Sequence, residues 1–144
     1  MHDTHTGNPA DTSRLPACRL AALLLVIGAA HFVIPKAPDA LVPAELPGNP
    51  RLYTYASGVA ELLIGAMLLT PRTRRHGGLA AAALFAAVFP ANLNMVWLWR
   101  DKPWPMRAIA VARLPLQIPL ITEALRLWRA GGRNQRRQDL RSTT

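Results

Sequence analysis

Long uncharged runs of apolar residues dominate the middle of the chain. Residues 77–99 carry no formal charge over 23 positions, and residues 52–71 carry only Glu61 over 20. Residues 20–35 add a further uncharged run of 16. An apolar stretch of about 18 or more residues with few charges can cross the hydrocarbon layer of a membrane as a helix. The pattern predicts an integral membrane protein and excludes a soluble nucleic-acid-binding domain as the main interpretation.

Proline and short polar segments divide these runs into four spans. Pro35 ends the first span and Pro71 the second, because proline cannot continue a regular helix. Residues 36–51 contain four prolines and are expected to form a loop with room for one short turn. We therefore expect an all-α fold, an integral membrane four-helix antiparallel bundle over residues 15–129. The predicted spans are 15–34, 52–70, 77–99 and 106–128, between a disordered cytoplasmic tail (1–14) and a basic cytoplasmic tail (130–144).

The first span also has the features of a cleaved signal peptide. Arg14 and Arg19 would form its basic region, residues 20–27 its apolar region and residues 28–30 a small-residue cleavage site. Against cleavage, the apolar character continues through Phe32, Val33 and Ile34. A transmembrane span is the interpretation carried forward, and whether the span is cleaved stays open.

Basic residues are distributed unevenly between the two sides of the predicted bundle. The chain has 17 Lys and Arg against 8 Asp and Glu, a formal charge of +9. With four spans, both tails and the turn at residues 72–75 share one side, and eleven of the 17 basic residues fall there. Short cytoplasmic loops are enriched in Lys and Arg. Both termini are therefore expected in the cytoplasm, and the charge indicates orientation rather than binding of nucleic acid.

Each span carries a polar residue that is costly in lipid and is therefore a candidate for function. At 1.5 Å per residue, one such residue in each span lies roughly 6 to 14 Å below the outer end of that span, and these four are His31, Glu61, Asn92 and Arg113. We expect them to meet in one layer, as a site that binds a ligand or exchanges protons. The candidate residues are His31, Glu61, Asn92, Arg113 and Gln117.

Helical spacing suggests how these side chains pair. Ser57, Glu61 and Gly65 recur every four residues, which places the carboxylate on a stripe of small residues that a neighbouring helix can approach closely. The simplest pairing joins Glu61 to Arg113, with His31 and Asn92 completing the hydrogen bonds. Two interpretations stay open, a functional site and a polar cluster that only sets the register of the helices.

Several kinds of chemistry find no support in the sequence. The single Cys18 excludes an internal disulfide or dithiol relay. No metal site is expected, since there is neither a closed zinc set nor a second intramembrane histidine to share a haem with His31. No catalytic residue is assigned, and we expect no catalytic activity from the chain on its own.

With the spans placed, the sequence resembles the DoxX-like family of small four-helix bacterial membrane proteins. The resemblance covers residues 19–127, nearly everything except the tails. One departure is the loop segment 37–40, where an aromatic residue would be expected. The segments that carry the resemblance include Gly28-Ala29-Ala30-His31-Phe32, Ala60-Glu61, Val88-Phe89-Pro90-Ala91-Asn92 and Arg113-Leu114-Pro115-Leu116-Gln117.

The resemblance implies a multi-pass protein of the bacterial inner membrane. Related proteins are described as membrane partners of redox or oxidative-stress enzymes, as a subunit of a quinone-linked oxidoreductase, or as helpers in the maturation of periplasmic enzymes. The expected function is thus an accessory or small-ligand-binding subunit with a polar pocket in the outer half of the bilayer. The alternatives are a quinone-linked oxidoreductase subunit, with quinone as cofactor and a membrane or periplasmic redox protein as partner, and a purely structural scaffold.

Overall fold

The computed structural model describes residues 14–142 and is helical over most of that length. Within the last helix, the side chains of residues 134–139, 141 and 142 lie outside the description. The predicted disordered tail also lies outside it, except for Arg14, which begins the first helix. The helices are α1 (Arg14–Val33), α2 (Lys36–Asp39), α3 (Pro50–Leu69), α4 (Arg74–Ala87), α5 (Phe89–Leu98) and α6 (Trp104–Ser142).

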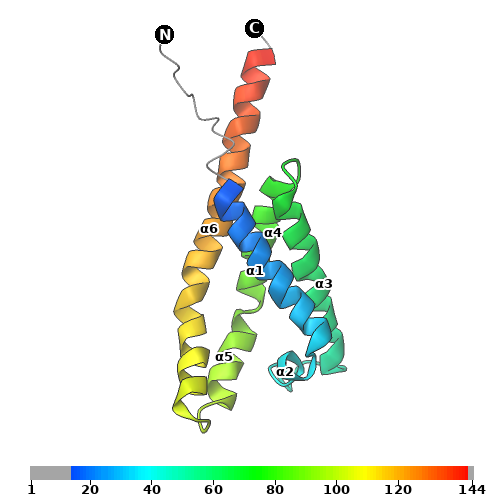
Figure 1. The fold of residues 1–144 in the computed structure, drawn as a ribbon, viewed down its shortest axis with the longest axis vertical. Helices are drawn as coiled ribbons and strands as arrows, with labels where there is room; N and C mark the ends of the chain where they lie inside the picture. Colours follow the sequence, from blue (N-terminus) through cyan, green and yellow to red (C-terminus); the bar gives the residue numbers. More distant parts are fainter. Residues whose placement is uncertain (1–13, 143–144) are drawn as a thin grey trace.

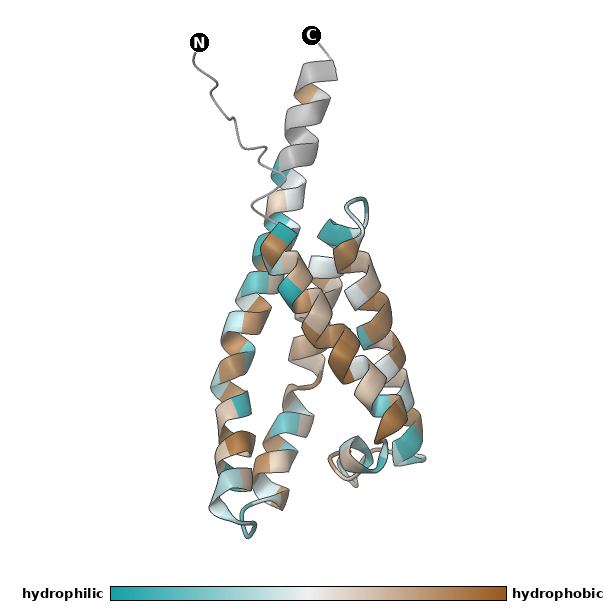
Figure 2. Ribbon diagram, viewed as in Figure 1, coloured by the Kyte–Doolittle hydropathy of each residue, from teal (hydrophilic) through white to brown (hydrophobic). Residues whose placement is uncertain are grey.

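Four stretches of helix are long and apolar enough to cross a membrane, and together they form an antiparallel bundle (Figure 1). They are α1, α3, α4 with α5, and the first 30 residues of α6. Many large apolar side chains on these helices point outward, such as Val26, Leu63 and Ile118. Figure 2 shows the apolar residues along the spans and the polar ones at their ends. The exposed apolar surface is that of a membrane protein, because lipid replaces water around it.

Local sequence signals explain where the helices begin and end. The Asn49 side chain accepts a hydrogen bond from the backbone N–H of Arg51 at 2.9 Å, and Pro50 follows this cap at the first turn of α3. The third span, expected to be continuous, is divided at Val88 into α4 and α5. Pro90 has no backbone N–H and its ring collides with the carbonyl one turn earlier, so the helix breaks just before it.

The helices of the bundle approach each other most closely at glycine residues. A Cβ atom added at Gly58 would lie 2.8 Å from the Phe32 ring of α1 and 2.9 Å from the His31 Cβ. A Cβ atom added at Gly78 of α4 would lie 2.8 Å from the Ala124 carbonyl oxygen of α6. Small residues allow such close approach between membrane helices, where van der Waals packing is a main source of association. The pairs α1–α3 and α4–α6 are the closest in the bundle.

The buried core lies in the half of the bundle near the two chain ends. It is made of small and aliphatic side chains from α1, α3, α4 and α6 with one aromatic ring. Its members are Ala17, Leu20, Ala21, Leu24, Ile64, Leu68, Ala81, Ala82, Phe85, Ala124 and Leu127. Because α1 supplies four of them, the first span is an integral part of the fold.

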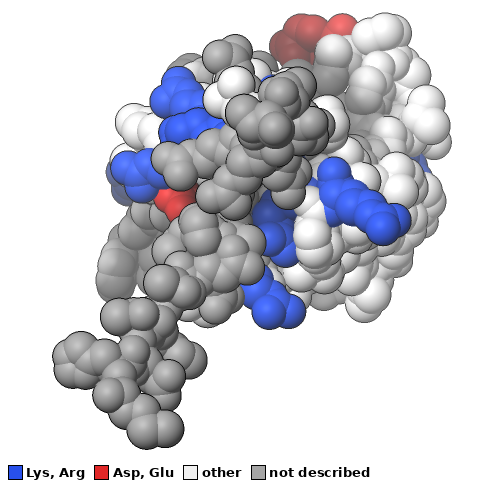
Figure 3. All heavy atoms as spheres, turned by 90° about the horizontal axis from the view of Figure 1, so that it is seen from above, with Lys and Arg blue, Asp and Glu red and all other residues white. Residues whose placement is uncertain are grey.

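The end of the bundle that carries the chain termini is rich in basic residues. Figure 1 places the start of α1, the turn between α3 and α4, and the projecting end of α6 on this side. Seen from above, Lys and Arg side chains outnumber acidic ones on this face (Figure 3). Helix α6 has 39 residues, which at 1.5 Å per residue is about 58 Å. It therefore continues well beyond the roughly 30 Å hydrocarbon layer, so that most of the predicted basic tail is helical.

Candidate functional site

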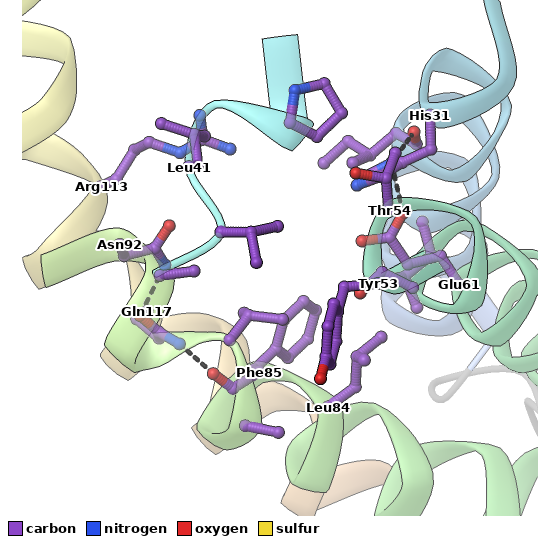
Figure 4. A pocket seen from close by; sticks show the side chains of 18 of the residues that line it. His31, Leu41, Tyr53, Thr54, Glu61, Leu84, Phe85, Asn92, Arg113 and Gln117 are labelled. Atoms are coloured by element: carbon purple, nitrogen blue, oxygen red, sulfur yellow. Dashed lines mark hydrogen bonds and ion pairs between the residues drawn. The ribbon is translucent and has the colours of Figure 1, made fainter. Parts of the chain in front are cut away.

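A cavity of about 330 Å³ occupies the other half of the bundle. One wall is formed by α1 and α3, the opposite wall by α4, α5 and α6, and the segment between α1 and α3 covers the end (Figure 4). All five residues singled out from the sequence line it. Most of the remaining lining is apolar, including Leu24, Phe85 and Leu120. A pocket of this size with a few convergent polar groups is typical of a small-molecule site.

His31 and Glu61 stand together on the wall formed by α1 and α3. The Nδ1 atom of His31 lies 2.7 Å from the Ile27 carbonyl oxygen and 3.2 Å from the Glu61 Oε2 atom. A carbonyl can only accept, so Nδ1 carries a proton that it donates to Ile27. Glu61 is 7% exposed, and its Oε2 accepts no hydrogen bond from the described part of the chain.

Gln117 and Asn92 form a second polar group on the opposite wall. The Gln117 Nε2 donates to the Phe85 carbonyl oxygen, and the Asn92 Nδ2 donates to the Gln117 Oε1 at 3.0 Å. The Phe85 carbonyl lies beside the break between α4 and α5, where the regular helical bonds are interrupted. Gln117 thus joins α4, α5 and α6 at the break, a structural role that the sequence did not reveal.

Arg113 lies one turn before Gln117 on α6, on the same wall. Its Nη1 is 3.8 Å from the sulfur of Met95, a weak acceptor. The predicted pairing of Glu61 with Arg113 is wrong, since no ion pair joins these two described side chains. Figure 4 shows them on opposite sides of the cavity. The physical reason is that α5 packs on α6 and turns away from α1 and α3 after the break at Val88, which leaves the two walls apart.

The covering segment, residues 36–49, is fastened to the bundle by hydrogen bonds that the depth of residues along the spans does not predict. Asp39 accepts hydrogen bonds from the Thr54 hydroxyl at 2.5 Å and from the Arg51 Nε at 2.7 Å. Both bonds favour the ionised form, with that from Thr54 the stronger, so the pKa of Asp39 is lowered. Asn94 on α5 donates to the Leu41 carbonyl at 3.1 Å.

The arrangement suits an uncharged or charge-balanced guest better than a metal ion. Within residues 14–142, no group of three or more His, Cys, Asp or Glu side chains could hold a metal. One wall presents the Glu61 carboxylate and the His31 imidazole, and the opposite wall presents the Arg113 guanidinium. Hydrogen-bond acceptors and donors therefore stand at two ends of an apolar space. The cavity can therefore bind a molecule with an apolar body and two polar ends.

Comparison with known proteins adds a family without an assigned activity. The model of a family described as a domain of unknown function (DUF8561) matches residues 20–128. The chain belongs to this family. The matched segment contains every residue that lines the cavity. No curated protein matches the chain, and no solved structure matches it.

Proposed function

We propose that this DUF8561 protein is an accessory membrane protein that binds the polar head of a small amphiphilic molecule in the cavity between its helix pairs. The observation that carries the proposal is the convergence of polar side chains from α1, α3, α5 and α6 on one apolar-lined cavity. Ionisable side chains at membrane depth are costly and persist mainly where they serve a purpose. Glu61 and Arg113 set the charge balance of the site, and His31 exchanges protons.

The protein resides in a bacterial inner membrane with both termini in the cytoplasm. The excess of basic residues around the chain ends supports this orientation. It places the cavity in the outer half of the bilayer, under the covering segment 36–49. An alkaline-phosphatase fusion at the carboxyl terminus should be inactive, and an active fusion would overturn the orientation.

A quinone-linked role beside a redox partner is the second candidate, in keeping with the DoxX-like resemblance. It is favoured by the placement of hydrogen-bonding groups at opposite ends of an apolar space, which suits a flat ring with an oxygen at each end. In this role the chain is a subunit, and the electrons come from a partner protein. A scaffold without a ligand is the third, and it requires that the cavity be empty in the cell.

The test is to identify what the cavity holds. The full chain is purified in mild detergent, its visible spectrum is recorded, and bound lipophilic molecules are extracted for mass spectrometry. Ala91→Phe adds a ring inside the cavity without changing charge, and Ala83→Phe adds the same ring on the exposed side of α4. A co-purified molecule lost in Ala91→Phe and kept in Ala83→Phe supports the proposal. Equal occupancy in both variants, or none in the wild type, overturns it.

A further inference from the structure

Two opposite charges face each other across the cavity without pairing. Glu61 lies on the wall formed by α1 and α3, and Arg113 on the wall formed by α5 and α6 (Figure 4). A direct ion pair would have closed the space between the walls. Here the apolar space remains, and each charge is left with incomplete hydrogen bonding.

On the acidic side, the unused group is one carboxylate oxygen. Glu61 is buried, with 7% of its surface exposed, and its Oε2 lies 3.2 Å from the His31 Nδ1. That N–H is directed to the Ile27 carbonyl, so Oε2 accepts no hydrogen bond from any described residue. A buried carboxylate without a donor is destabilising. A guest with an N–H donor next to Oε2 removes this cost.

On the basic side, the unused group is a guanidinium. Arg113 has five N–H donors, and the one hydrogen bond it makes within residues 14–142 is the long one to the Met95 sulfur. Guanidinium binds phosphate and carboxylate oxygens through paired hydrogen bonds. An anionic group on the same guest therefore completes this wall.

The cavity opens sideways toward the lipid. Leu23 of α1 and Leu116 of α6 line it and are also 36% and 56% exposed, so they lie at its mouth. Helices α1 and α6 make few contacts with each other. A mouth edged by leucines at membrane depth admits hydrocarbon chains and disfavours a fully polar molecule.

We propose that the cavity binds a zwitterionic phospholipid by its head, with the ammonium group at Glu61 and the phosphate at Arg113. The acyl chains leave between α1 and α6. The inference rests on the proposed function and narrows it to one class of amphiphile. It explains why carboxylate and guanidinium are held apart, since the head of such a lipid carries both countercharges a few bonds from each other.

Binding to the wild-type protein tests this without any substitution. The full chain in detergent micelles is examined by native mass spectrometry with lipids of identical acyl chains. The probes are phosphatidylethanolamine, its N-acetylated form and phosphatidylglycerol, the last two lacking the ammonium charge. We expect phosphatidylethanolamine to bind about tenfold more tightly than either, as one lost charge-assisted hydrogen bond predicts. Equal binding of all three overturns the inference.

Charge-neutralising variants locate the two contacts. Glu61→Gln should abolish the preference for phosphatidylethanolamine over its N-acetylated form, and Arg113→Gln should weaken all three lipids. The matched controls are Glu45→Gln in the covering segment and Arg107→Gln on α6, neither of which lines the cavity. Each variant is checked for folding by its helical circular dichroism and its elution volume. Controls that lower binding as much as Glu61→Gln and Arg113→Gln overturn the assignment.

Two further measurements distinguish failure of the zwitterionic-lipid inference from failure of the proposed function. Glycerophosphoethanolamine carries the same head without acyl chains, and its binding as tightly as the lipid would overturn a lipid ligand in favour of a soluble zwitterion. Ala91→Phe separates this inference from the proposed function. If Ala91→Phe blocks an amphiphile that shows no preference for the ammonium group, the zwitterion is wrong and the cavity function stands. If Ala91→Phe changes no binding, both fail.

Discussion

The two halves of this bundle differ in packing, because one half has a buried core and the other encloses a cavity. We call the half with the buried core and the chain ends the closed half, and the half with the cavity the open half. In the closed half, small residues bring backbones into contact, as at Gly78 against Ala124. In the open half, the helix pairs separate and polar side chains face the space between them. Within one short chain, tight packing and a binding space are thus divided along the length of the same helices.

The transition between the halves coincides with the helix break before Pro90. On the chain-end side of the break, α4 contacts both α3 and α6. On the cavity side, α5 packs against α6 and has lost the packing against α3. Gln117 holds the geometry at this point through its bonds to the Phe85 carbonyl and to Asn92. The comparison suggests that the closed half determines stability and the open half determines binding.

The largest expected effect is on the closed half. Gly78→Leu places a side chain where a Cβ atom would already meet the Ala124 carbonyl oxygen at 2.8 Å. Because backbone atoms cannot give way as a flexible side chain can, we expect a loss of about 3 kcal/mol or more in the free energy of unfolding. Denaturant titration in micelles, followed by circular dichroism, measures it. Ala83→Leu on the exposed side of α4 is the control, expected to change stability by less than about 0.5 kcal/mol.

An intermediate effect is expected at the junction of the halves. Gln117→Leu leaves the Phe85 carbonyl and Asn92 without their partner, and an unsatisfied buried polar group costs about 1–3 kcal/mol. Hydrogen exchange should become faster in α5 while α1 and α3 stay protected. Thr122→Val serves as control, since within the described part of the chain its hydroxyl bonds only to the Pro119 carbonyl on the same helix. Unchanged exchange in α5 would refute the role of Gln117 at the break.

The smallest effect is expected in the segment that covers the open half. Asp39→Asn weakens the bonds from Thr54 and Arg51, so a cysteine at position 46, introduced by Leu46→Cys in a Cys18→Ala background, should be labelled faster by a soluble maleimide. Stability should hardly change, because the segment adds little to the buried core.

The same anchor predicts a dependence on pH. The pKa of Asp39 is lowered mainly by the hydrogen bond from Thr54 and further by Arg51. A carboxyl group with a lowered pKa in the folded state stabilises the fold above its unfolded pKa, and this contribution disappears as the pH falls through the folded value. Proteolysis of the segment by an acid protease should therefore stay slow until the pH falls below the usual carboxyl range of about 3.9. Faster cleavage beginning above that range would contradict the anchor.

The sequence predicts the closed-half architecture well and the open half only in outline. Uncharged runs and prolines predict four spans, and the structure has four helical stretches that are long and apolar enough to cross a membrane. The same depth argument chose His31, Glu61, Asn92, Arg113 and Gln117, all of which line the cavity.

Their partners could not be predicted. Pairing depends on the rotation of each helix about its axis and on the divergence of α5 from α3 after Val88. The depth of a residue along its span gives neither. His31 therefore contacts Glu61 where Arg113 was expected. Asp39 and Thr54 are not singled out by the sequence, because polar residues near a loop are usually solvated. Their role comes from contacts between segments distant in sequence.

Because the mouth between Leu23 and Leu116 faces the lipid, occupancy of the cavity has to be related to the composition of the bilayer. A molecule that reaches the cavity through this opening never has to leave the bilayer, so the relevant concentration is its share of the surrounding lipid rather than its concentration in water. By mass action, occupancy follows that share. If the cavity binds lipid as proposed, an abundant lipid would fill it even with modest affinity, and a change in membrane composition would alter its occupancy without any soluble signal.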